Sequence, residues 1–292
     1  MVQFRAKISP KSLLSQGGYR GLHKFKCYYV ARMVWPKSLF LSPSPRGGIR
    51  RGGEKYFGPT FVRAAILFVC FTLSVAPVFA EDDPNDKLPM FGQPGIVRSD
   101  ALKERDEAVI REAALRYGNR SAASRALAAE GWTAARRGIF DAAMHRFNQA
   151  WLLNPKNFQA FWGFGAILSE RGKLVEALEQ LETARSLIDD NAQRAALLSD
   201  MGTVCSEYAA HMSSSRELER AQFFIKANNF FTESLENNPN FAPGWREWAI
   251  SLYEQERYSE AWVKAQRAQE LRAEPFPENF LAKLREKVPQ AK

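Results

Sequence analysis

The sequence has few of the residues that build metal, disulfide and nucleophilic catalytic sites. It contains 3 cysteines and 3 histidines in 292 residues, and of the cysteines only Cys205 follows residue 80. A single cysteine rules out a disulfide within that part of the chain, and no CxxC or Cys/His cluster has the spacing of a structural zinc site. There is also no Ser/His/Asp grouping. We therefore expect no enzyme, no metal and no cofactor.

The formal net charge of +9 is unevenly distributed along the chain. The first 80 residues hold 13 of the 41 Lys and Arg residues but only one of the 32 acidic residues, Glu54. Residues 81–292 therefore carry 28 basic and 31 acidic residues and are close to neutral. Because a neutral body offers no broad basic surface, we expect no nucleic acid partner.

A single long apolar run, AAILFVCFTLSVAPVFA, occupies residues 64–80. Arg63 precedes it, Val78 and Ala80 are small residues at −3 and −1 of a possible cut, and acidic polar sequence follows. This pattern is typical of a secretory signal peptide cleaved after Ala80. The run is short for a spanning helix and contains Pro77. We expect a periplasmic or secreted protein, and an uncleaved inner-membrane anchor is the alternative.

Residues 1–61 are too long for an ordinary leader before such a signal. They are basic, rich in Ser, Gly and Pro, and show no sustained periodicity, which predicts a disordered extension. One hypothesis is that translation begins at Val62, so that the signal peptide is 62–80. An organellar transit peptide is the alternative, because the segment is basic and poor in acidic residues.

From Ser99 onward the composition favours helices. Ala, Leu, Glu, Arg and Gln dominate, and Pro and Gly occur mainly at regular breaks. No useful run alternates apolar and polar residues with the period of a strand. The breaks predict helices at 99–118, 121–138, 141–154, 157–171, 174–188, 192–210, 216–236, 241–256, 258–272 and 277–288.

Small residues recur 34 positions apart, which indicates a repeat architecture. The pairs are Gly131 and Gly165, Gly138 and Gly172, Ala143 and Ala177, Ala150 and Ala184, and Ala227 and Ala261. With aromatic residues such as Phe147 at fixed places and Pro155 closing a unit, the chain resembles the tetratricopeptide repeat (TPR) family. The resemblance covers about 124–273 and implies an all-α solenoid of about four helical hairpins with capping helices. Stacking supplies its core, because no hairpin buries its apolar face alone.

The third unit is interrupted. Gly202 and Ala227 are 25 residues apart, whereas the equivalent pair in the first unit is 12 apart, so 13 extra residues lie near His211. The resulting domain plan is a linker at 81–98, an N-terminal capping helix at 99–123, the TPR domain at 124–273, and a C-terminal capping helix and tail at 274–292.

The resemblance also implies a binding surface. In the family, each hairpin consists of an A helix followed by a B helix, and A-helix positions not used for packing line a concave groove. Carried over by position, the groove residues are Arg125, Trp132, Arg136, Gln159, Trp162, Ser169, Arg246 and Tyr253. Trp, Tyr and Arg are enriched at interface hot spots. The alternative for Trp132 and Trp162 is that both are half-buried against neighbouring helices.

We therefore predict an exported, non-catalytic scaffold or adaptor that binds a protein or peptide, with apolar and acidic groups, in this groove. The sequence leaves the oligomeric state open. A membrane-anchored envelope assembly factor is the first alternative and differs in whether 64–80 is retained. A helical-solenoid enzyme or carbohydrate binder is the second, and it would need paired carboxylates beside the groove aromatics.

Overall fold

A computed structural model describes residues 83–92 and 98–288. These ranges form ten α-helices and three short 3-10 helices, without a strand. The expected extension and signal, 1–61 and 62–80, lie outside the described residues. The α-helices are α1 (Asp100–Tyr117), α2 (Arg120–Arg136), α3 (Phe140–Leu153), α4 (Phe158–Glu170), α5 (Leu174–Leu187), α6 (Asn191–Ala210), α7 (Glu217–Asn237), α8 (Ala242–Glu254), α9 (Tyr258–Glu270) and α10 (Phe280–Lys287). The predicted helices are confirmed to within a few residues at most ends.

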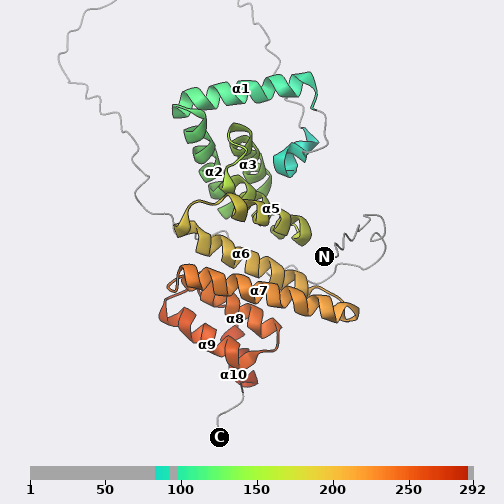
Figure 1. Cartoon of the computed structure of the whole chain (residues 1–292), viewed down its shortest axis with the longest axis vertical. Coiled ribbons are helices and arrows are strands. Elements are labelled where there is room, and N and C mark those ends of the chain that lie inside the picture. Colours follow the sequence, from blue (N-terminus) through green and yellow to red (C-terminus); the bar gives the residue numbers. More distant parts are fainter. Residues whose placement is uncertain (1–82, 93–97, 289–292) are drawn as a thin grey trace, which may run out of the picture.

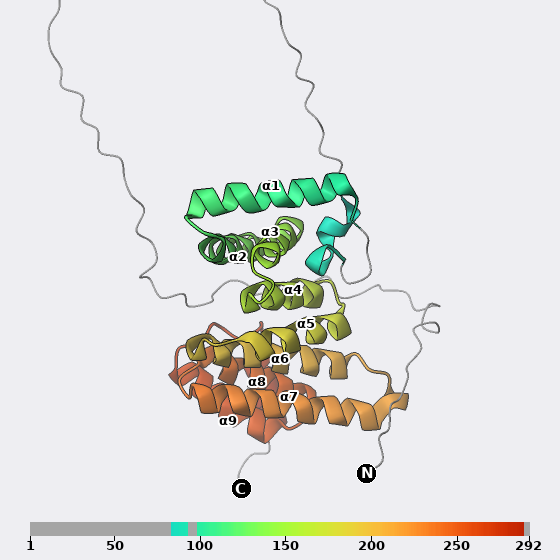
Figure 2. The same cartoon turned by 45° about the horizontal axis from the view of Figure 1, so that its top comes forward.

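The helices pack as four successive hairpins, α2 with α3, α4 with α5, α6 with α7, and α8 with α9. Each hairpin also contacts the next, and α1 and α10 pack at the two ends. Figure 1 shows this stack running in chain order from α1 to α10, and Figure 2 shows α1 lying across the end formed by α2 and α3. The predicted solenoid is confirmed. The first unit begins earlier than predicted, because Asn119 caps α2 by accepting a hydrogen bond from the backbone N–H of Ala122.

Phe147 shows how the sequence pattern produces the stacking. Its side chain is fully buried between two hairpins. A Cβ atom added to Gly131 on α2 would lie 2.8 Å from the Phe147 ring, and one added to Gly163 on α4 would lie 2.4 Å from it. Only glycine leaves room for the ring at these two positions. Phe147 is therefore a packing residue between the first two hairpins.

The extra residues of the third unit lengthen its two helices. Helix α6 has 20 residues and α7 has 21, against 13 and 14 for α4 and α5. A short 3-10 helix, Ser214–Arg216, joins them. Tyr208 and Phe223 pack edge to face across the extension with ring centroids 4.7 Å apart. The insertion near His211 is therefore a projecting end of the hairpin.

The described part of the predicted linker is a folded segment, and this corrects the domain plan. The 3-10 helices Pro84–Lys87 and Pro89–Gly92 pack against α3. Asn148, fully buried on α3, donates to the carbonyl oxygens of Asp86 and Leu88 and accepts from the N–H of Phe91. One buried amide thus satisfies three backbone groups that would otherwise lack partners.

A buried charge cluster fixes the beginning of this segment to α1. Arg98 lies with its Nη1 atom 3.3 Å from the carboxylate of Asp83 and donates from Nη2 to Asp106 at 3.0 Å. Its guanidinium also lies 4.3 Å from the ring centroid of Phe91.

Among the described residues, no helix combines the length and hydropathy needed to cross a membrane.

Candidate partner-binding face

Helices α4 and α6 lie side by side and are joined by three pairs of polar side chains. In order along the helices, Gln159 donates to Gln193 at 3.1 Å, Trp162 Nε1 donates to Asp200 at 2.7 Å, and Ser169 makes a longer contact with Glu207 at 3.4 Å. The three acceptors are seven residues apart on α6, so they share one stripe of that helix. Because residue numbers rise together on both sides, the two helices run in the same direction.

Helix α2 extends this arrangement on the other side of α4. The Trp132 ring packs edge-on against Trp162, with centroids 5.4 Å apart. Arg125 precedes Trp132 by seven residues and Arg136 follows it by four, which places all three on one stripe of α2. Near the helix starts, the Asn157 side chain donates to the Ser124 hydroxyl at 2.8 Å, so α2 and α4 are also parallel.

The A helices of the first three units thus present nine side chains in three rows, which we call the three-row face. The first row is Arg125, Gln159 and Gln193, the middle row is Trp132, Trp162 and Asp200, and the last row is Arg136, Ser169 and Glu207. Of the six groove residues predicted from the first two units, Trp132 and Trp162 are in contact, and the other four lie on the same stripes of α2 and α4. The α6 column was missed, although its seven-residue spacing is visible in the sequence.

The two tryptophans form the floor of this face. Trp132 is 4% exposed and Trp162 is fully buried, so neither ring offers a surface to a partner. This corrects the expectation that both indoles line the groove as contact residues, and the alternative that they pack against neighbouring helices is closer to the structure. Arg125 and Arg136 are exposed, Ser169 is half-buried, and Gln159 is buried.

The two groove residues predicted in the fourth unit have a different role. Arg246 is buried and donates from Nε and Nη2 to the carbonyl oxygen of Pro275 at 3.2 and 3.0 Å. Tyr253 packs against Phe280 of α10, with ring centroids 5.3 Å apart. Both side chains hold the C-terminal segment on α8. They are not part of the three-row face, because the C-terminal segment occupies them.

The acidic side chains of α6 have unusual titration behaviour. Burial raises the pKa of Asp200 to about 7, although the hydrogen bond from Trp162 favours its charged form. The Glu207 side chain reaches solvent, yet surrounding protein atoms raise its pKa, and the nearby Glu170 carboxylate raises it further. Loss of hydration disfavours the charged form of a carboxylate, so its pKa rises.

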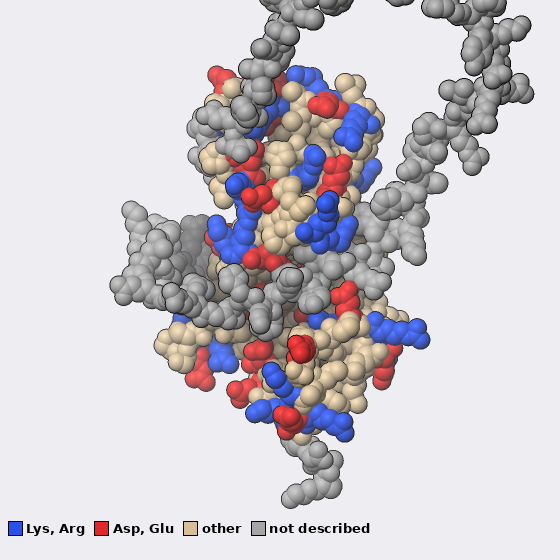
Figure 3. Space-filling view, turned by 180° about the vertical axis from the view of Figure 1, so that it is seen from behind, with Lys and Arg blue, Asp and Glu red and all other residues tan. Residues whose placement is uncertain are grey.

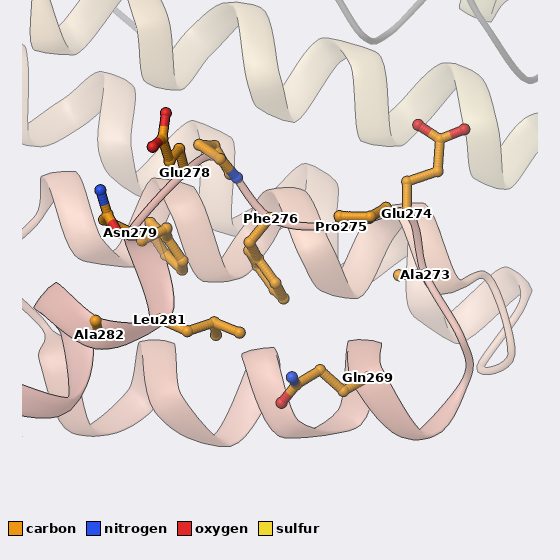
Figure 4. A pocket seen from close by; sticks show the side chains of 11 residues that line it. Gln269, Ala273, Glu274, Pro275, Phe276, Glu278, Asn279, Leu281 and Ala282 are labelled. Carbon is orange, nitrogen blue, oxygen red and sulfur yellow. The ribbon is translucent and has the colours of Figure 1, made fainter.

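A separate hollow of about 480 Å³ lies beside the C-terminal segment, lined by residues 269 and 273–282. In Figure 4, Phe276 and Leu281 extend into the space above α9, while the carboxylates of Glu274 and Glu278 point away from it. This hollow has no convergent polar groups, so we do not assign the site there. Among the described residues, no three His, Cys, Asp or Glu side chains are grouped to hold a metal ion.

Comparison with known proteins gives matches in the solved structures alone. No family model matches the chain, and no curated protein matches it. A structure titled "MamA RS-1 ArsTM double mutant" is 17% identical, with a TM-score of 0.38, and the match covers 60% of this chain and 97% of that one. The structure titled "Crystal structure of YrrB: a TPR protein with an unusual peptide-binding site" is 16% identical, with a TM-score of 0.25 and coverage of 64% and 96%.

The 34-residue period and the four stacked hairpins make the chain a TPR-like helical solenoid. Stacked helical repeats create extended concave surfaces, which proteins of this architecture use for binding.

Proposed function

We propose that this protein is an exported, non-catalytic scaffold that holds a segment of a partner protein across its three-row face. The observation that supports the proposal is the parallel alignment of α2, α4 and α6, which places exposed and half-buried polar side chains on either side of two buried tryptophans. The first and last rows of the face carry exposed Arg125, Arg136 and Glu207. The buried tryptophans are already held in place, so only the exposed polar side chains lose rotamer freedom when an extended peptide binds.

The position of Asp83 agrees with the proposed export. Asp83 is buried and paired with Arg98, and it lies three residues after the proposed cut at Ala80, so it would remain in the cleaved chain. Cleavage there would remove the apolar run and leave the folded segment intact. The mass of the protein isolated from its native host tests this proposal: a chain beginning at Glu81 supports it, and a chain that retains 64–80 favours the anchored alternative.

Site-specific photo-crosslinking tests the proposed binding face. A photoreactive residue is placed at Ala166 or Thr203, half-buried positions of α4 and α6 between the middle and last rows. Matched controls are Leu115 on α1 and Val263 on α9, which are 85% and 60% exposed. In cells producing the full chain, we expect one protein adduct at Ala166 and Thr203 that is absent at the controls. Adducts of equal yield at all four positions would contradict binding at the three-row face.

A further inference from the structure

The two basic residues at the α2 side of the three-row face lack acidic partners. Arg125 donates to the Ser121 hydroxyl and Arg136 to the Thr133 hydroxyl, both on their own helix. Neither forms an ion pair with a described residue. Elsewhere such pairs are frequent, and Figure 3 shows basic and acidic side chains lying close together on the opposite side from that of Figure 1. The positive charge at this edge is therefore not neutralised by nearby described side chains.

The α6 side of the face carries acidic groups. Asp200 accepts the Trp162 N–H and Glu207 accepts the Ser169 hydroxyl, and the nearby His211 partly offsets the rise in the pKa of Glu207 that burial causes. Helix α6 contains two carboxylates, Asp200 and Glu207, and one basic residue, Arg194. The Arg194 guanidinium donates to the carbonyl oxygen of Ile188, before the start of α6. No lysine or arginine of α4 or α6 neutralises the α6 stripe.

The face therefore changes sign from one helix to the next. Trp132 touches Trp162, and Trp162 donates to Asp200, so the basic and acidic stripes lie on either side of the same aromatic floor. Charged groups of opposite sign on one face favour a partner with the complementary arrangement. A chain crossing from α2 to α6 would meet cations first and carboxylates afterwards.

We propose that the partner segment is a charge-polarised extended peptide, with acidic residues against the exposed Arg136 and basic residues against the exposed Glu207. This inference rests on the proposed function and specifies its ligand. Adjacent packed helices lie about 8–10 Å apart, so α2 and α6 are roughly 16–20 Å apart. At about 3.3 Å per residue of extended chain, the acidic and basic groups of the partner are separated by about six residues.

Two isomeric probe peptides test the charge order. The polarised probe is fluorescein-labelled Asp-Asp-Gly-Ser-Gly-Ser-Lys-Lys, and its isomer is Asp-Lys-Gly-Ser-Gly-Ser-Asp-Lys, with the same composition and no polarity. Both are titrated with the full chain by fluorescence anisotropy at low ionic strength. We expect the polarised probe to bind about fivefold more tightly, since both charges at each of its ends are then opposite in sign to the side chain that they meet.

Charge-reversal variants locate the effect on the protein. Arg136→Glu or Glu207→Lys alone gives both edges of the last row the same sign, and either should abolish the preference for the polarised probe. In the double variant the acidic side chain lies on α2 and the basic one on α6. The preference for the polarised probe should therefore return, with the peptide bound in the opposite direction. Lys283→Glu and Glu286→Lys, exposed on α10, are the matched controls and should leave it unchanged.

Equal affinity of the two probes for the unmodified chain would overturn the charge inference. Equal effects of the last-row and α10 variants on the preference for the polarised probe would also overturn it. If crosslinks still form at Ala166 and Thr203, the proposed function stands and the partner is held by uncharged contacts. If both the crosslinks and the preference are absent, the binding face itself is wrong.

Discussion

At the scale of single residues, the hydrogen bond between Trp162 and Asp200 determines the character of the binding face. The indole fills the space between α2, α4 and α6, and its N–H group holds a carboxylate whose pKa is about 7. In the unfolded chain the pKa of an aspartate is near 3.9. The folded protein thus retains a proton on Asp200 that the unfolded chain loses between these two values.

Replacing Asp200 with Asn should therefore change how stability depends on pH. Because the folded-state pKa is raised, the contribution of Asp200 is present below about pH 4 and is lost as the pH rises through about 7. We expect D200N to match the unmodified protein at pH 4 and to exceed it by roughly 1–3 kcal/mol at pH 8. Urea unfolding from pH 4 to 8 measures this, with exposed Asp100→Asn as control. A pH-independent difference would contradict it.

Gly163 offers a second residue-scale prediction. An alanine there would bring its Cβ to 2.4 Å from the Phe147 ring, so Gly163→Ala should lower the free energy of unfolding by about 1–3 kcal/mol. Gly131→Ala would place its Cβ 2.8 Å from the same ring and should lower the free energy of unfolding by less. Adding Phe147→Leu to Gly163→Ala should make the combined loss smaller than the sum of the single losses, as urea denaturation can show. Strict additivity would mean that the ring and the glycine do not interact.

At the scale of helices, the sequence predicts the helices and their hairpins well, but it does not predict where the segments outside the repeats pack. Glycine breaks and the 34-residue period locate the hairpins because both features are local. The segment 84–92 has no periodicity and is held by Asn148, about sixty residues away, so nothing local predicts its position. The predicted role of Arg246 failed for the same reason, since its partner Pro275 lies outside the repeat pattern.

Asn148→Ala should release the N-terminal segment from α3. The substitution leaves two backbone carbonyls and one N–H without their buried partner, which costs on the order of 2–3 kcal/mol. We expect faster hydrogen exchange and faster limited proteolysis in 84–92, with the hairpins unaffected. Gln149→Ala, the next residue on α3, is the matched control. Unchanged protection of 84–92 would show that Phe91 and Arg98 hold the segment without Asn148.

The projecting end of the third hairpin should be dispensable for folding. Replacing residues 208–223 with Arg-Gly-Lys copies the α4–α5 turn at 171–173 and removes the 13 extra residues. The remaining core residues of α6 and α7 stay in place, because each unit packs mainly on its neighbours. We expect a cooperative unfolding transition and a smaller helical signal by circular dichroism. Loss of cooperative unfolding would show that the extension is part of the core.

At the scale of the whole molecule, a stack of hairpins brings residues from three repeats onto one surface. No single repeat contains the three-row face; it exists because α2, α4 and α6 are parallel and adjacent. Its six residues in the first two units follow from the repeat pattern. The burial of the tryptophans and the acidic α6 column depend on packing between units, which the pattern does not specify.

Filling this face is the most direct test of the proposed scaffold. The partner segment identified by crosslinking is synthesised and titrated by calorimetry against the full chain, Ala166→Trp and Val263→Trp. The added indole at Ala166 covers the face between its middle and last rows, whereas Val263 lies on α9. We predict at least a tenfold loss of affinity for A166W, unchanged affinity for V263W, and unchanged helicity in both. Equal affinity of all three proteins would contradict binding at the three-row face.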